Sequence, residues 1–282
     1  MPENTYEFLC HLPRADFYKN GLNYRSGLYY STEHPRQYME CFYKEGCTNM
    51  PVILWIHGGA WDDEYLTASY RPELTLAQLA ANGYFIACLE YRLSRHAALP
   101  ACLEDCEKAI QFLRDNADEL LIDPEKIGLW GESAGAHIAC MVGSNYSGRM
   151  IKPVQCIISF YCPSDLCRMA RDMGQDIGFL VNVLPHHVSD QVEQERIFQK
   201  MSPVSYADRP GIPPVLLFHG EQDSVVSCEQ SVIYAEKLRN AGNEAEMILV
   251  PGQGHGFFEG REYYDRIIQF IEKKISKNGG KV

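Results

Sequence analysis

The sequence predicts an α/β fold built on a mostly parallel, doubly wound sheet. Short apolar runs rich in β-branched and aromatic residues alternate with segments of helical periodicity, the pattern of parallel strands joined by crossover helices. No repeat of roughly 20 to 50 residues occurs, which excludes solenoids and propellers. The 282 residues are 46% hydrophobic and 22% charged, enough to bury a sizeable core. We expect one domain over residues 1–282.

Six apolar runs are expected to be parallel strands buried on both faces, because they are continuous rather than alternating. They lie at 52–56, 84–89, 127–130, 156–160, 215–218 and 247–250. Upstream, residues 24–30 and 37–43 stand too close together for a crossover helix. These two segments should therefore form an antiparallel N-terminal edge of the sheet.

Helical periodicity is clearest between residues 99 and 114. One apolar stripe is formed by Leu99, Cys102, Leu103, Cys106, Ala109, Ile110 and Leu113. The opposite face carries Glu104, Lys108, Gln111 and Arg114. The same spacing recurs at Ala235 and Leu238 and from Tyr264 to Ile275. Each segment is expected to be a helix that covers the sheet.

The segment from Leu166 to about Tyr206 breaks this alternation, because it contains no clear strand. Ligands bind at the carboxyl ends of the strands in open α/β sheets. We therefore predict a small, partly helical cap insertion at about 166–206 that forms a lid or a pocket wall. The alternative is a peripheral packing element or a subunit contact, as in a homodimer.

Charge and cysteine content limit the possible partners. The 26 Lys and Arg against 37 Asp and Glu give a net charge of −11, which opposes binding to nucleic acids and anionic lipids. No stretch approaches the roughly 20 apolar residues of a membrane span, and the first residues are acidic where a signal peptide is basic. Eleven irregularly spaced cysteines predict reduced thiols. We expect a cytoplasmic protein without nucleic-acid or membrane partners.

Two residue pairs consist of residue types that commonly bind metals, but neither pair is expected to form a metal site. Cys102 and Cys106 lie four apart on an apolar helix face, where cysteine packs as a small hydrophobe. His186 and His187 are adjacent, so their side chains point to opposite sides in most backbone conformations. We expect no metal and no cofactor.

A serine occupies the turn between an expected strand and an expected helix. Residues 131–135 read Gly-Glu-Ser-Ala-Gly, after the strand at 127–130 and before the helical run at 136–141. In this context the strained turn lifts the serine hydroxyl above the sheet, and the flanking glycines let strand and helix approach closely. Ser133 is therefore predicted to be a nucleophile.

A serine hydroxyl needs a base to accept its proton and a carboxylate to orient that base. His255 lies between two glycines after the strand at 247–250, and Asp223 follows the strand at 215–218. The order Ser133, Asp223, His255 is the order of α/β-hydrolases. Asp165 is the alternative acid, but a carboxylate on the strand just before that of the histidine is the commoner arrangement.

Residues 57–61 read His-Gly-Gly-Ala-Trp after the strand at 52–56. Glycines leave their amides unshielded toward a developing oxyanion. We assign Gly58 and Gly59, with the amide of Ala134, to an oxyanion hole.

Other residues beside these motifs have less defined roles. His57 is expected to fix the loop by hydrogen bonding rather than to transfer protons. Trp61 either lines the substrate pocket or packs in the core. Glu132 and Phe257 are further candidate pocket residues.

On these motifs the chain resembles the hormone-sensitive-lipase-like esterase group of α/β-hydrolases. The similarity runs from Pro51 to Phe258 and also includes Tyr91-Arg92-Leu93, Pro100, Asp105 and His219-Gly220. Within the group it is most similar to the bacterial acetylxylan/feruloyl esterase-like family. The resemblance implies a cofactor-free serine hydrolase of short or aromatic acyl esters, often of plant carbohydrates. Where relatives often read Tyr-Arg-Leu-x-Pro-Glu, the chain has Arg95-His96 in place of Pro-Glu, and it has Ala136 where a second glycine is common; neither departure belongs to the triad.

The motifs thus predict a serine carboxylic ester hydrolase. The resemblance implies substrates that are short-chain, above all acetyl, esters of carbohydrates or small molecules. One alternative is a feruloyl-type aromatic esterase. Another is an amidase or peptidase with the same triad, although peptidases of this fold usually carry a further large domain. A non-catalytic binding protein is disfavoured because no triad member is missing.

Overall fold

The computed structural model describes residues 21–68, 74–150, 152–174, 178–185, 188–257 and 261–275. His186 and His187, the acidic N-terminal residues and the C-terminal residues after Ile275 lie outside the described residues. Among the helices within these ranges, none combines the length and the apolar character needed to cross a bilayer.

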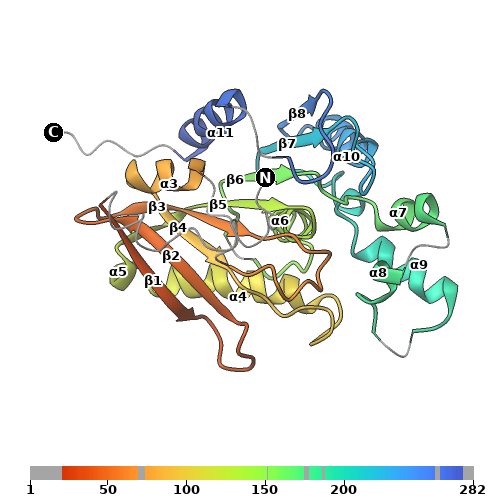
Figure 1. Ribbon diagram of the computed structural model, residues 1–282, viewed down its shortest axis with the longest axis horizontal. Helices are drawn as coiled ribbons and strands as arrows, with labels where there is room; N and C mark the ends of the chain where they lie inside the picture. The colour runs from red at the N-terminus through yellow and green to blue at the C-terminus, as the bar shows by residue number, and fades with distance from the viewer. Residues whose placement is uncertain are drawn as a thin grey trace, which may run out of the picture.

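Eight strands form one sheet in the order β1-β2-β4-β3-β5-β6-β7-β8 (Figure 1). The strands are β1 (Leu22–Tyr29), β2 (Tyr38–Lys44), β3 (Met50–Ile56), β4 (Phe85–Leu89), β5 (Ile122–Glu132), β6 (Cys156–Phe160), β7 (Val215–Gly220) and β8 (Ala245–Val250). β2 pairs antiparallel with β1 and β4, and all other pairs are parallel. The predicted parallel sheet with an antiparallel N-terminal edge is confirmed.

Helices cover both faces of this sheet, as a doubly wound fold requires. They are α3 (Leu74–Ala81), α4 (Ala101–Asp115), α5 (Ala117–Leu120), α6 (Ala134–Gly143), α7 (Leu166–Met173), α8 (Gly178–Val181), α9 (Gln191–Lys200), α10 (Glu229–Asn240) and α11 (Arg261–Lys274), with a short 3₁₀ helix η1 (Pro203–Ser205). Buried residues of α4, α6 and α10 share one core cluster, and those of α3 and α11 share the other (Figure 1).

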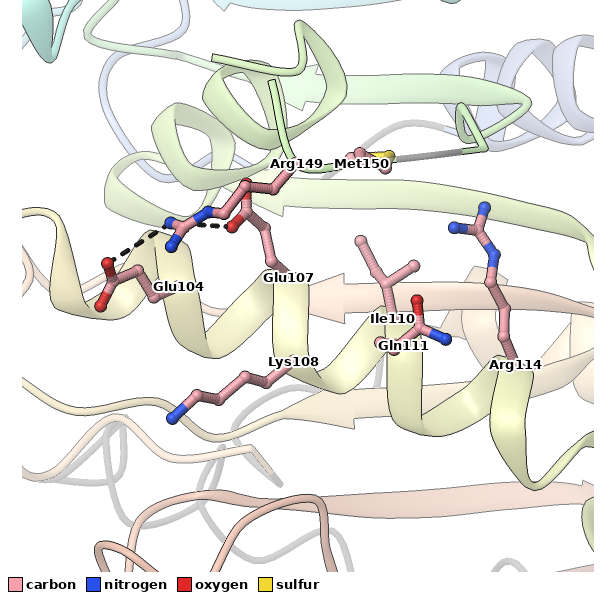
Figure 2. A pocket seen from close by; sticks show the side chains of 8 residues that line it. All are labelled: Glu104, Glu107, Lys108, Ile110, Gln111, Arg114, Arg149 and Met150. Carbon is pink, nitrogen blue, oxygen red and sulfur yellow. Dashed lines mark hydrogen bonds and ion pairs between the residues drawn. The ribbon is translucent and has the colours of Figure 1, made fainter. Parts of the chain in front are cut away.

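The outer face of α4 borders a surface hollow of about 320 Å³ (Figure 2). Its lining includes Glu104, Glu107 and Arg149, whose guanidinium pairs with the two carboxylates at 3.4 and 3.1 Å. Among the residues that border this hollow, none is one that the sequence predicts to be catalytic.

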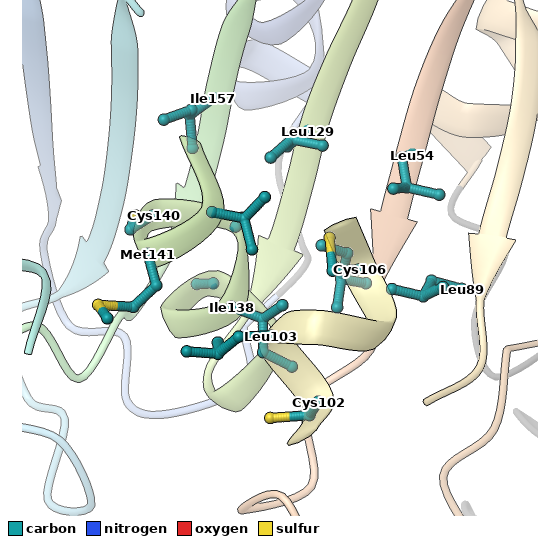
Figure 3. Close-up of a cluster of buried hydrophobic side chains, with 14 of the residues drawn as sticks. Leu54, Leu89, Cys102, Leu103, Cys106, Leu129, Ile138, Cys140, Met141 and Ile157 are labelled. Carbon is teal, nitrogen blue, oxygen red and sulfur yellow. The ribbon is translucent and has the colours of Figure 1, made fainter. Parts of the chain in front are cut away.

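The inner face of α4 packs against α6 and the sheet (Figure 3). Leu103 and Cys106 of α4 meet Ile138 of α6 and Leu129 of β5 in one apolar cluster. Burial raises the pKa of the Cys106 thiol and of Cys102, so both remain protonated and pack as small apolar groups.

The segment between β6 and β7 is largely helical and holds α7, α8, α9 and η1. These helices stand together beyond the sheet, in green to blue-green on the right of Figure 1. Leu180, Val183 and Phe198 anchor them in the core that α4 and α6 share. Asp165 and Asp190 cap α7 and α9, since each side chain accepts a hydrogen bond from a backbone amide three residues later, at 2.9 Å.

Candidate active site

Ser133 lies in a strained turn between β5 and α6. Its φ of 51° and ψ of −118° place a non-glycine residue in a region that L-residues rarely adopt. The backbone amide of Ser133 donates to the carbonyl oxygen of Phe160 at 2.9 Å, which ties the turn to the end of β6. The side chain is therefore presented at the carboxyl edge of the sheet.

The two glycines of the turn are required by the close approach of β5 and α6. A Cβ atom on Gly131 would lie 2.2 Å from the carbonyl oxygen of Gly135. A Cβ atom on Gly135 would lie 2.1 Å from the carbonyl oxygen of Ile56 at the end of β3. Both contacts are with backbone atoms, so no side-chain rearrangement relieves them.

Three side chains from the ends of three strands form one chain of contacts. Nε2 of His255 lies 3.1 Å from Oγ of Ser133, and Nδ1 of His255 lies 2.7 Å from Oδ2 of Asp223. Because a carboxylate only accepts, Nδ1 carries the proton and Nε2 is free to accept from the serine hydroxyl. The imidazole is 22% exposed, so a substrate can reach it.

Asp223 receives hydrogen bonds on both carboxylate oxygens. Oδ1 accepts from the amides of Val225 at 2.9 Å and Val226 at 2.8 Å, and Nε2 of the buried His219 lies 3.2 Å from Oδ2. Burial alone would raise the pKa of Asp223, but hydrogen bonds from His219 and His255 outweigh it and hold this pKa well below its usual value. The carboxylate is ionised and fixed in place.

Asp165, the alternative acid, has a different position. Its carboxylate caps the first turn of α7, where it accepts from the amide of Arg168. Asp223, not Asp165, is therefore the carboxylate that contacts His255.

The loop at 57–61 lies directly against the serine turn. A Cβ atom on Gly58 would lie 3.3 Å from Cβ of Ser133. Gly59 has a φ of +103°, and Trp61 is also in the left-handed region at +60°. Ala134 begins α6, where backbone amides and the helix dipole favour negative charge. The predicted oxyanion donors thus belong to two segments that meet at Ser133.

His57, the first residue of this loop, is fully buried. Its Nδ1 lies 2.8 Å from the carbonyl oxygen of Gly58, and its ring stacks on Tyr91 with the centroids 4.4 Å apart. The Tyr91 hydroxyl donates to the carbonyl oxygens of His57 and Gly58 at 3.0 and 3.2 Å. These contacts fit a residue that holds the loop.

Glu90 is a residue of this region that the sequence analysis missed. Its buried carboxylate pairs with Arg36, lies 3.6 Å from Nε2 of His57 and accepts from the amide of Ala68 at 2.8 Å. Burial would raise the pKa of Glu90, but His57 and Arg36 outweigh it and lower this pKa. The available signal was a carboxylate directly after the buried run at 84–89.

The three candidate pocket residues are all buried. Trp61 is 2% exposed and belongs to the core cluster that α4 and α6 share. Glu132 accepts a hydrogen bond from the hydroxyl of Tyr161 at 3.3 Å, and the ring of Phe257 contacts that of Tyr161. Tyr161, also missed by the sequence analysis, lies against the His255 ring with the centroids 4.6 Å apart. Glu132 and Phe257 thus contact a residue that itself contacts the histidine.

Known proteins share sequence similarity with this chain. The BD-FAE family model matches residues 41–238, well over half of the chain. The Mycobacterium tuberculosis protein "Esterase LipC" is 28% identical over 73% of this chain and 53% of its own length. The Arabidopsis thaliana "Isoprenylcysteine alpha-carbonyl methylesterase ICME" is 28% identical over 73% of this chain and 50% of its own. The chain spans about half the length of these curated relatives.

Solved structures share the fold. A truncated carbohydrate esterase from gut microbiota has a TM-score of 0.80 at 23% identity, over 90% of this chain and 97% of the other. A bacterial heroin esterase has a TM-score of 0.79 at 21% identity, over 96% of this chain and 89% of the other. The predicted α/β-hydrolase fold is confirmed.

Proposed function

Because the chain belongs to the BD-FAE family, which confirms the resemblance drawn from its motifs, we propose that it is a serine carboxylic ester hydrolase. The observation that carries the proposal is the contact of Ser133 with His255 and of His255 with Asp223. The nucleophile and the orienting carboxylate are each within hydrogen-bond reach of the base before any substrate binds. The names of the curated relatives support the same class of reaction.

The proposed mechanism passes through an acyl-enzyme. Oγ of Ser133 attacks the ester carbonyl while Nε2 of His255 takes the hydroxyl proton, and Asp223 stabilises the resulting imidazolium. The amides of Gly58, Gly59 and Ala134 donate to the tetrahedral oxyanion. His255 then protonates the leaving alcohol. A water molecule, deprotonated by the same imidazole, releases the acid and restores the hydroxyl of Ser133.

We propose short acyl esters as substrates, above all acetyl esters of carbohydrates or small molecules. The structural similarity to a protein named as a carbohydrate esterase supports this choice. A feruloyl-type esterase and an amidase use the same triad, so they differ from the proposal only in substrate.

Hydrolysis of 4-nitrophenyl acetate by wild type and by Ser133→Ala tests the proposal. We expect the variant to lose activity by a factor on the order of 10³ or more. The matched control is Ser144→Ala. The hydroxyl of Ser144 donates to the carbonyl oxygen of Cys140 at the end of α6 opposite Ser133, so it has no part in the proposed mechanism. Comparable rates for wild type and Ser133→Ala would contradict the mechanism.

Substrate choice needs a separate experiment. Acetyl, butyryl, octanoyl and feruloyl esters, an acetylated xylo-oligosaccharide and an aminoacyl amide would be compared by kcat/KM. We expect the acetyl esters to be cleaved fastest. Preference for octanoyl would indicate a lipase-like pocket, and preference for the amide would indicate an amidase.

Two further parts of the proposal concern the insertion and the location. The insertion at 166–206 follows β6, whose last residue bonds the Ser133 amide, so we assign it to one wall of the substrate pocket. We also propose a cytoplasmic location, with which the expected reduced state of the cysteines is consistent, and cell fractionation would test it.

A further inference from the structure

We infer that His137 is a positioning residue that fixes the oxyanion loop, residues 57–61, to the nucleophile helix α6 and to the end of the insertion. The inference deepens the proposed function and rests on it, because the loop has a catalytic role only if an oxyanion forms at Ser133. His137 contacts neither the substrate nor the reacting atoms in this role.

His137 lies one helical turn after Ser133. Its backbone amide donates to the carbonyl oxygen of Ser133 at 3.0 Å, and its side chain is completely buried. The position of this imidazole is thus set by the same helix that begins at the nucleophile.

The imidazole of His137 joins two segments that are distant in sequence. Its Nδ1 lies 3.2 Å from Nε1 of Trp61, and its Nε2 lies 2.6 Å from the carbonyl oxygen of Met201. The two aromatic rings are perpendicular, with their centroids 5.1 Å apart. Both ring nitrogens therefore have partners.

The chemistry of the two partners fixes the protonation of the ring. An indole N–H only donates, so Nδ1 of His137 must accept, and a carbonyl oxygen only accepts, so Nε2 must carry the proton. Burial lowers the pKa of His137 to about 4, so this neutral form is the one present near pH 7. A protonated ring would have no acceptor left for Trp61.

Trp61 transmits this constraint to the oxyanion glycines. Both Ala60 and Trp61 have positive φ values, 47° and 60°, which cost free energy in a residue with a side chain. The indole bond to His137 and the bond from the Ser94 amide to the Trp61 carbonyl, at 2.8 Å, hold this conformation. Since Gly59 is only two residues from Trp61, its amide is fixed relative to Ser133.

Met201 connects the same imidazole to the insertion. Met201 directly follows α9 as its C-cap residue, and the next residue, Ser202, accepts a hydrogen bond from the amide of Leu166 at 2.9 Å. Ser202 also donates to the carbonyl oxygen of Phe198 at 2.6 Å. The start of α7 and the end of α9 therefore meet beside His137, so a displacement of the insertion acts on the oxyanion loop.

The kinetic test removes the indole donor without removing the aromatic ring. We expect Trp61→Phe to lower kcat for 4-nitrophenyl acetate about tenfold or more, with KM changed less than about threefold, because an oxyanion donor acts in the transition state. The matched control is Trp55→Phe, whose equally buried indole N–H has no hydrogen-bond partner within the described ranges. The control should keep kcat within about twofold.

Substitutions of His137 itself separate positioning from packing. His137→Asn keeps an acceptor near the place of Nδ1, whereas His137→Phe keeps only the ring. We expect His137→Asn to keep most of the wild-type kcat and His137→Phe to lose it, although the two variants should have similar melting temperatures. Equal kcat in wild type, Trp61→Phe and His137→Phe would overturn the inference.

A measurement on the unmodified protein is independent of activity. In ¹⁵N-labelled wild type, the histidine spectrum should show His137 protonated on Nε2, and the Trp61 indole N–H should exchange slowly with solvent. A proton on Nδ1 or rapid exchange would contradict the contact, even if no variant folds. If wild type cleaves no ester but these signals are present, the proposed function fails while the contact stands.

Discussion

His219 and His255 contact the same carboxylate oxygen. Oδ2 of Asp223 lies 2.7 Å from Nδ1 of His255 and 3.2 Å from Nε2 of His219. His219 also bonds the carbonyl of Val226 at 2.8 Å and the hydroxyl of Ser231 at 2.7 Å, so it is held at both nitrogens. Asp223 is thus supported by the buried His219 near the end of β7, the strand that precedes its loop, and its role can be tested directly.

Asp223→Asn should lower kcat by a factor of roughly 10³ to 10⁴ near pH 7. An amide can donate to Nδ1 of His255 and so favour the tautomer in which Nε2 is protonated and cannot accept from Ser133. The measurement is kcat for 4-nitrophenyl acetate, with circular dichroism to verify folding. Asp165→Asn is the matched control, since asparagine caps a helix as well as aspartate. Loss of activity in the control would assign the acid to Asp165 instead.

The free energy of unfolding should decrease as the pH falls from about 6.5 to about 4, in part because of His137. A histidine in the unfolded chain takes up a proton near pH 6.5, whereas the folded His137 does so only near pH 4. The unfolded state therefore gains a proton first, and stability on the order of 3 kcal/mol is lost across this window.

Urea unfolding of wild type and of His137→Asn between pH 7 and pH 4 would measure this contribution. The variant has no titratable group at this position, so its stability should fall less steeply. Parallel pH profiles for the two proteins would mean that His137 titrates alike when folded and unfolded.

Glu90→Gln should destabilise the protein by about 2 to 4 kcal/mol, because it leaves the charge of Arg36 without its buried partner. The control is Glu64→Gln, which removes a carboxylate from an exposed pair with Arg95 at 3.2 Å and should cost less than about 1 kcal/mol. Chemical denaturation of the three proteins gives both values. If the two variants lost equally little free energy of unfolding, the ion pair of Glu90 would contribute no more to stability than a surface ion pair.

Gly135→Ala should cost about 3 kcal/mol or more, because the added methyl group meets the backbone of β3. Gly242→Ala is the comparison: its φ is +82° but the surrounding space is open, so we expect a cost of about 1 to 2 kcal/mol from backbone strain alone. The melting temperatures of the two variants distinguish the effect of a steric clash at Gly135 from the effect of backbone strain at Gly242. A milder effect at Gly135 would show that β3 and α6 can move apart.

The sequence predicts those features whose signal is local. The contact of Ser133, Asp223 and His255 follows from three recognisable strand ends, since the carboxyl ends of parallel strands share one edge of a sheet. The strands at 52–56 and 156–160 are confirmed within one or two residues of β3 and β6, because each is a continuous apolar run between turn residues.

Other elements lack such a signal. The helix α3 was not predicted, because Leu74–Ala81 is apolar on most sides and shows no polar stripe. The strand β5 begins at Ile122, five residues earlier than expected. The sequence does not indicate this start, because Pro124 and its charged neighbours interrupt the apolar run. The pairing of β5 with β3 shifts register in the same region.

The contacts around the oxyanion loop could not be predicted either. His137 meets Trp61 across 76 residues and Met201 across 64, and no local pattern marks such partners. The pairing of Glu90 with Arg36 likewise depends on how β2 and β4 lie side by side.

The strand order places Ser133 beside a central strand and His255 beside an edge strand of the sheet. Ser133 follows β5, which is flanked by β3 and β6, whereas His255 follows β8 at the end of the sheet, beside β7. Fraying of this last strand would withdraw the imidazole while the rest of the fold stayed intact. On warming, turnover should therefore disappear some degrees before the far-ultraviolet dichroism does, and it should return on cooling.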